Sequence, residues 1–250
     1  MDQHKYVFVS GLHRSGTSLM FQILREQDDF SGFRDTGKPE DEGQHVQTVF
    51  KPAYFYGGPG KFGFDQDAYL NEHSSLLTPE NNNRLKEEWG EYWDLSKTYL
   101  LEKSPPNLIR SRYLQTIFPD SYFITIQRHP IAVAFATRKW SKTSIQSLIE
   151  HWLTCYGIFE KDKGHLKNQM TIRYEDFVSQ PKETISKIGE FLGTDLVFPE
   201  EIEVRTNVNK KYFEKWEKYS KGLFSKKKAV RIKEELEEKV NEYSYSLISY

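Results

Sequence analysis

Short apolar runs alternate along most of the chain with segments of helical periodicity. Runs rich in β-branched and aromatic residues at Tyr6–Ser10, Thr98–Leu101, Tyr122–Ile126 and Met170–Tyr174 have the length of buried strands. Strands separated by helical segments are typical of a parallel sheet with helices packed on it. The pattern therefore predicts an α/β protein with a four- or five-stranded parallel sheet.

The segments between these strands supply the expected helices. One helix is expected to begin near Thr17, and Pro181–Leu192 places four apolar side chains on one helical face. Glu87–Trp93 and Ile145–Phe159 also have helical patterns, whereas Tyr54–Tyr69 is rich in glycine and aromatic residues and is expected to be a loop. No repeat or domain boundary interrupts the chain, so residues 1–250 are expected to form one domain.

Composition narrows the class of protein. The 250 residues include 35 basic and 36 acidic side chains, and this balance argues against a nucleic-acid partner. No apolar run is long enough to span a membrane, and the polar residues 1–5 do not resemble a signal peptide. The single cysteine, Cys155, lies in an apolar helical pattern and is expected in the core. A reducing, cytoplasmic location is the simplest interpretation.

One segment departs from this charge balance. Arg205–Lys233 contains eleven basic residues and only two acidic ones, Glu214 and Glu217. A solvated basic surface is the default interpretation of such a run. Its role stays open at this stage.

The strongest chemical signal is the segment Gly11-Leu-His-Arg-Ser-Gly-Thr-Ser18, between the first strand and the first helix. The backbone N–H groups of such a loop, together with the helix N-terminus, form an anion site. Hydroxyl groups of Ser15, Thr17 and Ser18 add donors, and Arg14 adds a fixed charge. The segment therefore predicts a phosphate-binding loop.

The nucleotide-triphosphate loop is a related pattern that this segment does not complete. Gly11 and Gly16 have the spacing of G-x-x-x-x-G-K-[ST], but Thr17 stands where that motif requires lysine. Later strands end in Lys103 and Arg128 rather than in a carboxylate that could hold magnesium. The sequence therefore predicts an anion site that needs no metal.

Four segments, in order, resemble sulfotransferases that use 3′-phosphoadenosine 5′-phosphosulfate (PAPS). The resemblance covers residues 6–193 and implies a P-loop-like three-layer α/β fold, with a central four- or five-stranded parallel sheet and helices on both faces. It also implies PAPS as co-substrate and a hydroxyl-bearing acceptor. The segments are the loop Gly11–Ser18, similar to that of tyrosylprotein and several bacterial enzymes, Leu101–Pro105 (E-K-[ST]-P), Phe123–Trp140 and Ile172–Gly193 (YED…P…FLG).

The resemblance also implies which residues bind the donor. Arg128 matches the arginine that binds the 3′-phosphate, but the family's serine eight residues later is Ala136 here, so the neighbouring Thr137 is the expected substitute. Tyr174 matches a residue at the adenine. The family's C-terminal glycine-rich loop is absent, and Asn209–Tyr212 is a candidate replacement. The residues expected at the 5′-phosphosulfate are His13, Arg14, Ser15, Gly16, Thr17 and Ser18.

For catalysis, the resemblance places Lys103 at the leaving oxygen and a glutamate base within Lys38–Gln47. Glu42 aligns best with that base, with Glu40 and Asp41 as near competitors. His45 is the rival base, since cytosolic members of the family use histidine. An acidic helix N-terminus is the alternative interpretation of the three carboxylates. Arg14 completes the expected catalytic set, at the sulfuryl group.

Two other functions stay open. A P-loop kinase or nucleotide triphosphatase would depend on magnesium, and a non-catalytic protein would bind the product 3′,5′-adenosine bisphosphate without turnover. A sugar hydroxyl is favoured as acceptor over a tyrosine, a small alcohol or a phenol, with the aromatic loop Tyr54–Phe64 as a possible lid. Acceptor identity and oligomeric state are not encoded in a recognisable pattern.

Overall fold

Five parallel strands form one sheet at the centre of the molecule. A computed structural model describes residues 4–250, and the first three residues of the polar segment 1–5 lie outside the described residues. The strand order across the sheet is β2-β3-β1-β4-β5, with β1 in the middle. The strands are β1 (Lys5–Ser10), β2 (Phe30–Gly32), β3 (Tyr99–Lys103), β4 (Ser121–Gln127) and β5 (Gln169–Arg173).

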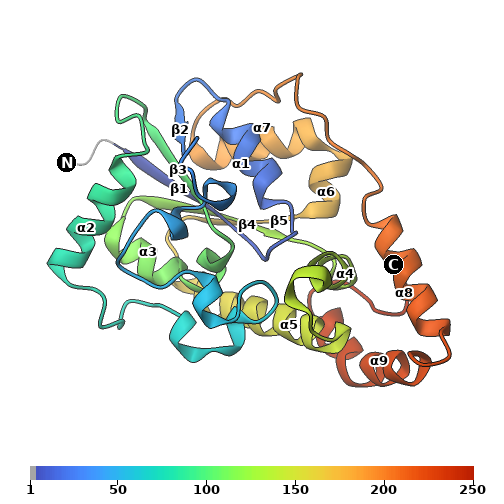
Figure 1. The fold of residues 1–250 in the computed structure, drawn as a ribbon. Helices are drawn as coiled ribbons and strands as arrows, with labels where there is room; N and C mark the ends of the chain where they lie inside the picture. The colour runs from blue at the N-terminus through green and yellow to red at the C-terminus, as the bar shows by residue number, and fades with distance from the viewer. Residues whose placement is uncertain (1–3) are drawn as a thin grey trace.

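Helices cover both faces of this sheet. Figure 1 shows α1, α6 and α7 on one face and α2, α3 and α5 on the other, with α8 and α9 at one end of the molecule. The expected three-layer α/β fold is confirmed. The helices are α1 (Thr17–Arg25), α2 (Pro79–Gly90), α3 (Ser111–Ile117), α4 (Pro130–Ser141), α5 (Ile145–Asp162), α6 (Tyr174–Ser179), α7 (Pro181–Leu192), α8 (Lys210–Lys221) and α9 (Lys226–Asn241).

The parallel arrangement brings the carboxyl ends of the strands to one edge. In the register of β1, Phe8 lies opposite Glu102 of β3 and Phe123 of β4. The segments that follow β1, β3 and β4 therefore emerge side by side, although they are far apart in the sequence. Ligands of open parallel sheets bind at this edge.

The strand predictions are confirmed, with small differences at the ends. The three-residue strand β2 escaped prediction because it is too short to show an alternating pattern. β5 stops at Arg173, and Tyr174 is the first residue of α6 rather than the end of a strand. Helix α2 begins at Pro79, well before Glu87, because the Thr78 side chain accepts a hydrogen bond from Asn81 N and caps it.

Aromatic packing fills the core between the sheet and its helices. The fully buried ring of Phe8 lies between Phe118 and Phe123, at centroid distances of 5.5 and 5.4 Å. Cys155 is fully buried, as its apolar pattern predicted. Three tryptophans, Trp93, Trp152 and Trp216, are buried as well.

The glycine-rich segment Tyr54–Tyr69 folds into short 3-10 turns, η3 (Ala53–Tyr56), η4 (Phe62–Phe64) and η5 (Gln66–Ala68), and packs on α5. Gly63 N donates a hydrogen bond to His151 Nε2 at 3.0 Å. A Cβ atom on Gly63 would collide with Cys155 Sγ, so the close approach requires glycine. The packing leaves Tyr54, Phe55 and Phe64 exposed on the outer side of the segment.

Replacing Gly63 by alanine should therefore loosen this segment from α5. The added methyl group must displace Cys155, which lies in a tightly packed core, so we expect Gly63→Ala to lower the free energy of unfolding by about 1–3 kcal/mol. Gly164→Ala is the matched control, because a Cβ at Gly164 meets nothing within 4 Å. Denaturant unfolding measures both variants, and equal stabilities would contradict the close fit.

Candidate active site

The loop between β1 and α1 is held against the rest of the sheet edge by two glycines. Gly11 has a φ of 140°, and a Cβ there would collide with the Ile126 carbonyl oxygen. Gly16 has a φ of 102°, and its Cβ would lie 2.6 Å from the Tyr174 ring. Gly16 is also the N-cap residue of α1 and provides no side-chain cap, so the first N–H groups of α1 have no such partner. The loop therefore has the backbone of an anion site.

The side chains of this loop divide between its two surfaces. Ser15 and Thr17 are buried, whereas Arg14 and Ser18 are exposed. The Arg14 guanidinium lies 5.0 Å from the centre of the Trp140 ring, and Ser18 Oγ donates to Glu40 Oε2 at 3.3 Å. Arg14, with a φ of 72°, thus extends from the loop and places an exposed positive charge at its rim.

His13 points inward from the same loop. Its ring meets Phe62 edge-on at 5.8 Å, and its Nδ1 is buried without a hydrogen-bond partner. Burial, followed by the neighbouring His151, Lys103 and His45, lowers the pKa of His13 to about 3. His13 is therefore neutral at physiological pH and can donate a hydrogen bond to a ligand without adding charge.

Lys103 and Glu42 form a buried ion pair beside the loop. Lys103 Nζ lies 3.0 Å from Glu42 Oε1 and donates to the Glu40 carbonyl oxygen at 3.2 Å. Gln44 Nε2 donates to the other carboxylate oxygen of Glu42 at 2.5 Å. Both charged side chains are more than nine-tenths buried. A carboxylate and an ammonium group in contact here can accept a proton and neutralise a leaving oxygen.

Glu102, the residue before Lys103, holds the backbone next to this ion pair through hydrogen bonds. Its carboxylate accepts hydrogen bonds from Gly43 N at 2.9 Å, from Ser104 Oγ at 2.6 Å and from Asn107 Nδ2. Ser104 Oγ in turn accepts from Gln44 N at 3.0 Å. Burial raises the pKa of Glu102 from 4.5 to about 7, against the lowering effect of these donors. The buried carboxylate thus fixes the backbone directly after Glu42.

The backbone before Glu42 is strained. Glu40 and Asp41 both have a positive φ, of 55° and 48°. Such conformations cost of order 1–3 kcal/mol each for residues with a side chain. Asp41 Oδ1 offsets part of the cost by accepting from Thr36 N and Thr36 Oγ1, at 2.9 and 2.8 Å. The turn carries Glu42 inward to Lys103 while Glu40 remains near the surface.

His45 lies at the same place but on the outer side. His45 Nε2 is 3.7 Å from Glu42 Oε2, and its ring is nearly parallel to that of Tyr54 at 6.1 Å. Burial lowers the pKa of His45, an effect that Glu42 opposes and Lys103 reinforces. The structure therefore brings together both candidate bases, Glu42 and His45, with Lys103.

Arg128 occupies the other end of the loop, as part of a hydrogen-bonded network. Its guanidinium donates to the Arg14 carbonyl oxygen at 2.6 Å and, through two nitrogens, to Asn209 Oδ1 at 2.9 and 2.8 Å. Asn209 Nδ2 donates to Glu175 Oε1 at 2.6 Å. The planar guanidinium of Arg128 thus binds two oxygen atoms, and the same geometry suits two oxygens of a phosphate group.

Tyr174 and Thr137 lie near this network but differ in what they offer. The Tyr174 ring is only 6% exposed, because it is covered by Gly16 and by the Arg128 guanidinium 4.1 Å from its centre. It supports the loop and presents little surface for stacking. Thr137 is buried, and its Oγ1 has no hydrogen-bond partner. Ala136 instead packs in a small apolar cluster with Tyr212.

Several residues that make hydrogen bonds around the site could not be assigned a role from the sequence. Glu102 belonged to the E-K-[ST]-P segment, but the sequence suggested no role for it in the site. Glu175 and Tyr245, which is hydrogen-bonded to it at 2.9 Å, became visible only through their contacts. Asn209 lay in the segment suspected of replacing the missing glycine-rich loop, and its contact with Arg128 places that segment beside the loop.

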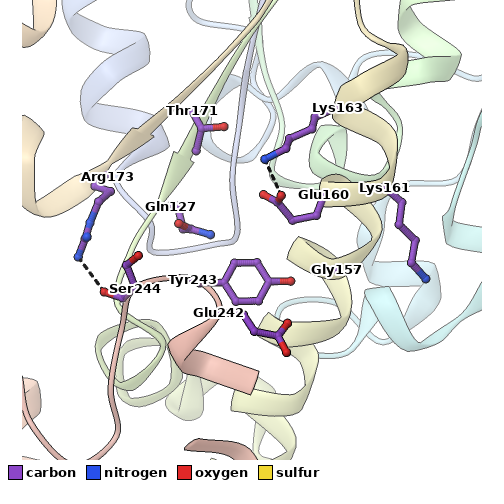
Figure 2. A pocket seen from close by; sticks show the side chains of 10 residues that line it. All are labelled: Gln127, Gly157, Glu160, Lys161, Lys163, Thr171, Arg173, Glu242, Tyr243 and Ser244. Atoms are coloured by element: carbon purple, nitrogen blue, oxygen red, sulfur yellow. Dashed lines mark hydrogen bonds and ion pairs between the residues drawn. The ribbon is translucent and has the colours of Figure 1, made fainter. Parts of the chain in front are cut away.

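A pocket elsewhere on the surface does not involve the expected residues. Figure 2 shows it at the ends of β4 and β5, where Gln127, Thr171 and Arg173 face Tyr243 and the end of α5. Arg173 donates there to the Ser244 carbonyl oxygen at 3.4 Å. None of the residues expected to bind the donor or to act in catalysis lines this pocket.

The fold is a P-loop-like α/β arrangement in which Arg14 lies on the loop between β1 and α1, and Lys103 and Arg128 lie at or just after the ends of the neighbouring strands. The sequence model of the sulfotransferase family matches residues 7–199, and the chain belongs to that family. The resemblance noted in the sequence is confirmed, and the protein is a sulfotransferase by class.

Solved structures agree with this assignment at the level of the fold. The chain is similar to the sulfotransferase domain of the curacin biosynthetic pathway, with 16% identity and a TM-score of 0.56, covering 97% of this chain and 98% of that one. It is also similar to the sulfotransferase domain of the Synechococcus PCC 7002 olefin synthase, with 21% identity, a TM-score of 0.51 and coverage of 77% and 74%. No curated protein sequence matches the chain.

Two kinds of feature are absent from the described part of the chain. Within residues 4–250, no helix combines the length and the apolar character needed to cross a bilayer. The same part of the chain contains no group of three or more histidine, cysteine, aspartate or glutamate side chains placed to hold a metal ion.

The raised pKa of Glu102 has a measurable effect on stability. Because the folded protein holds the Glu102 proton up to about pH 7 and the unfolded chain releases it near 4.5, folding stability should fall as the pH rises through this interval. We expect the stability of the wild type, measured relative to Glu102→Gln, to fall by about 1–3 kcal/mol between about pH 5 and about pH 8.

Urea unfolding of both proteins across this range provides the measurement, with the exposed Glu91→Gln as control. The control should show a constant difference from the wild type. A wild type that gains stability over Glu102→Gln as the pH rises would mean that the three donors dominate over burial.

Proposed function

We propose that this sulfotransferase transfers a sulfuryl group in line from PAPS to a hydroxyl group of its acceptor, without a metal ion. The observation that supports this most directly is the buried Lys103–Glu42 pair, 3.0 Å apart, at the end of β3 beside the phosphate-type loop. It combines, next to an anion site, a cation for the leaving oxygen and a carboxylate for the acceptor proton. The family assignment favours the same reaction.

In this proposal, the loop and Arg128 hold the two ends of the donor. The N–H groups at the start of α1 and the side chains of His13, Ser15, Thr17 and Ser18 would hold the 5′-phosphosulfate, with Arg14 closing over it. Arg128 would bind the 3′-phosphate, with Thr137 as the hydroxyl partner because its Oγ1 is buried and unpaired. In this interpretation Asn209 Oδ1 marks the position of a phosphate oxygen.

The chemistry follows from the charges at the sheet edge. The bond between sulfur and the phosphate oxygen breaks as the acceptor oxygen attacks sulfur. Lys103 neutralises the negative charge that develops on the departing phosphate oxygen, and Glu42 accepts the proton of the attacking hydroxyl. Because Lys103 Nζ and Glu42 Oε1 lie only 3.0 Å apart, the two groups can act on the leaving oxygen and on the attacking hydroxyl of the same transfer. Sulfuryl transfer needs positioning and charge stabilisation, much as phosphoryl transfer does.

The acceptor would enter beside His45, where the packed 3-10 turns expose Tyr54 and Phe55. These rings are 61% and 58% exposed, and Tyr54 lies parallel to His45. Exposed aromatic faces next to a base suit a sugar ring or an aromatic acceptor. A sugar hydroxyl is the favoured acceptor, because Leu101–Pro105 resembles the E-K-[ST]-P segment of carbohydrate sulfotransferases.

The decisive binding test is a calorimetric titration with 3′,5′-adenosine bisphosphate, ATP and AMP, each with and without magnesium. We expect tight binding of the bisphosphate alone, unaffected by magnesium, because Arg128 supplies a fixed cation for the 3′-phosphate. Arg128→Ala should abolish the preference for the bisphosphate over AMP, whereas Arg138→Ala, an exposed arginine on α4, should preserve it.

Three results would each contradict a different part of the proposal. Preferential binding of ATP with magnesium would favour the hypothesis that the protein is a kinase or a nucleotide triphosphatase. Tight binding of the bisphosphate without any turnover across an acceptor screen would favour a non-catalytic protein. An unchanged affinity in Arg14→Ala would remove Arg14 from the donor site.

The base is tested by single amide substitutions. Glu42→Gln should lower turnover about a hundredfold or more, because the amide cannot accept the acceptor proton, while the bisphosphate affinity stays nearly unchanged. Glu40→Gln and His45→Gln should retain most of the turnover. The readout is sulfation of an acceptor found by screening, or PAPS hydrolysis where none is found. Loss of turnover in His45→Gln with an active Glu42→Gln would identify His45 as the base instead.

A further inference from the structure

The turn between α8 and α9 exposes two large apolar side chains at its tip. Leu223 is 88% and Phe224 is 91% exposed, more than any other large apolar residue of the described chain. Figure 1 shows the two helices forming a hairpin at one end of the molecule, away from the sheet. Scattered apolar residues on a surface are ordinary, but two adjacent ones at a protruding tip indicate a contact with something apolar.

The same tip carries a dense positive charge. Five exposed lysines lie within five residues of Leu223 or Phe224, and one of them, Lys221, pairs with Glu217 at 3.4 Å. The other four have no ion-pair partner within residues 4–250. This cluster belongs to a chain whose net charge is only −1. The five are Lys218, Lys221, Lys226, Lys227 and Lys228.

Three of these lysines occupy an electrostatically unfavourable place. Lys226, Lys227 and Lys228 fill the first turn of α9, where the helix dipole is already positive. No acidic side chain stands in that turn, and Ser225 provides no side-chain cap. A solvated basic surface would gain nothing from this placement, whereas an anion-rich surface facing the tip would be attracted by the lysines and the helix end together.

The hairpin behind the tip is firmly held. Trp216 of α8 is fully buried and donates through Nε1 to the Leu247 carbonyl oxygen at 2.9 Å. Ile232, Leu236 and Val240 of α9 are buried on the opposite helix. The tip is therefore presented by a packed support rather than by a loose tail, and its apolar pair cannot turn inward.

We propose that this hairpin tip docks the enzyme on the surface of an anionic lipid bilayer. Leu223 and Phe224 enter the interface between headgroups and acyl chains, and the five lysines lie over the lipid phosphates. Nucleic acid would match the charge but leave Leu223 and Phe224 exposed to water. A lipid surface satisfies both features of the tip, and the proposal is independent of which acceptor the enzyme uses.

The test is co-sedimentation of the full chain with phosphatidylcholine vesicles that contain or lack phosphatidylglycerol. We expect binding to the anionic vesicles only, weakening as salt is added. Leu223→Ser/Phe224→Ser and, separately, Lys226→Gln/Lys227→Gln/Lys228→Gln should each reduce the partition coefficient roughly tenfold or more. The control is Leu95→Ser/Val197→Ser, two exposed apolar residues elsewhere, which should bind as the wild type does.

Three results would overturn the proposal. One is an anionic-vesicle affinity that neither the serine pair nor the glutamine triple changes. Another is binding to a DNA duplex as tight as to the vesicles and insensitive to the serine pair, which would assign the tip to a polyanion. The third is a concentration-dependent dimer, seen by light scattering and removed by the serine pair, which would assign the tip to a second copy of the chain. Circular dichroism confirms that each variant is folded.

Discussion

The candidate active site is organised around a buried carboxyl group, which solvent cannot reach and which therefore needs hydrogen-bond donors from the protein. Glu102 is fully buried at the end of β3, and its three donors come from Gly43, Ser104 and Asn107. A buried polar group is tolerated only when its hydrogen bonds are complete, so these donors cannot move independently. Gly43 has no room for a side chain there, since a Cβ would lie 2.5 Å from Glu102 Oε1. The position of Glu42 follows from this arrangement.

Lys103, the next residue on the same strand, makes a second set of contacts with this turn. Lys103 reaches the Glu40 carbonyl oxygen and the Glu42 carboxylate, so one strand end both builds the turn and completes the ion pair. On the other side of β1, Arg128 connects the Arg14 backbone to Asn209 at the start of α8. The phosphate-type loop is thus flanked by two fixed cations whose partners come from distant parts of the chain. Positive charge at the edge is therefore preorganised before any ligand binds.

The sequence allowed much of this to be predicted where local pattern and chemistry coincide. Strong apolar patterns mark the strand that ends at Lys103, the strand just before Arg128 and the helix from Pro181 to Leu192, and the structure confirms all three elements. Helix α2 was misplaced because its first turns are polar and its start depends on the Thr78 cap.

The roles of Glu102 and Asn209 could not be predicted, because each acts through a partner dozens of residues away. Tyr174 shows the same limit: its motif was recognisable, but only the folded chain shows its ring covered by Gly16 and Arg128. The turn at Glu40 and Asp41 is a related case. A positive φ on two consecutive acidic residues is held by the surrounding contacts and has no pattern of its own.

The spacing of the Glu42–Lys103 and Arg14–Arg128 contacts has a consequence for how the enzyme acquires its activity. The first joins residues 61 positions apart, and the second joins residues 114 positions apart. Loops of this length close only when the central strands pair, so neither contact can form early from local structure. A ribosome that has released only the first hundred residues holds a chain with the loop but without Lys103 or Arg128. Arg14, Lys103 and Arg128 therefore come together only after the chain has been synthesised past Arg128, and an amino-terminal fragment that ends before Lys103 cannot assemble these contacts.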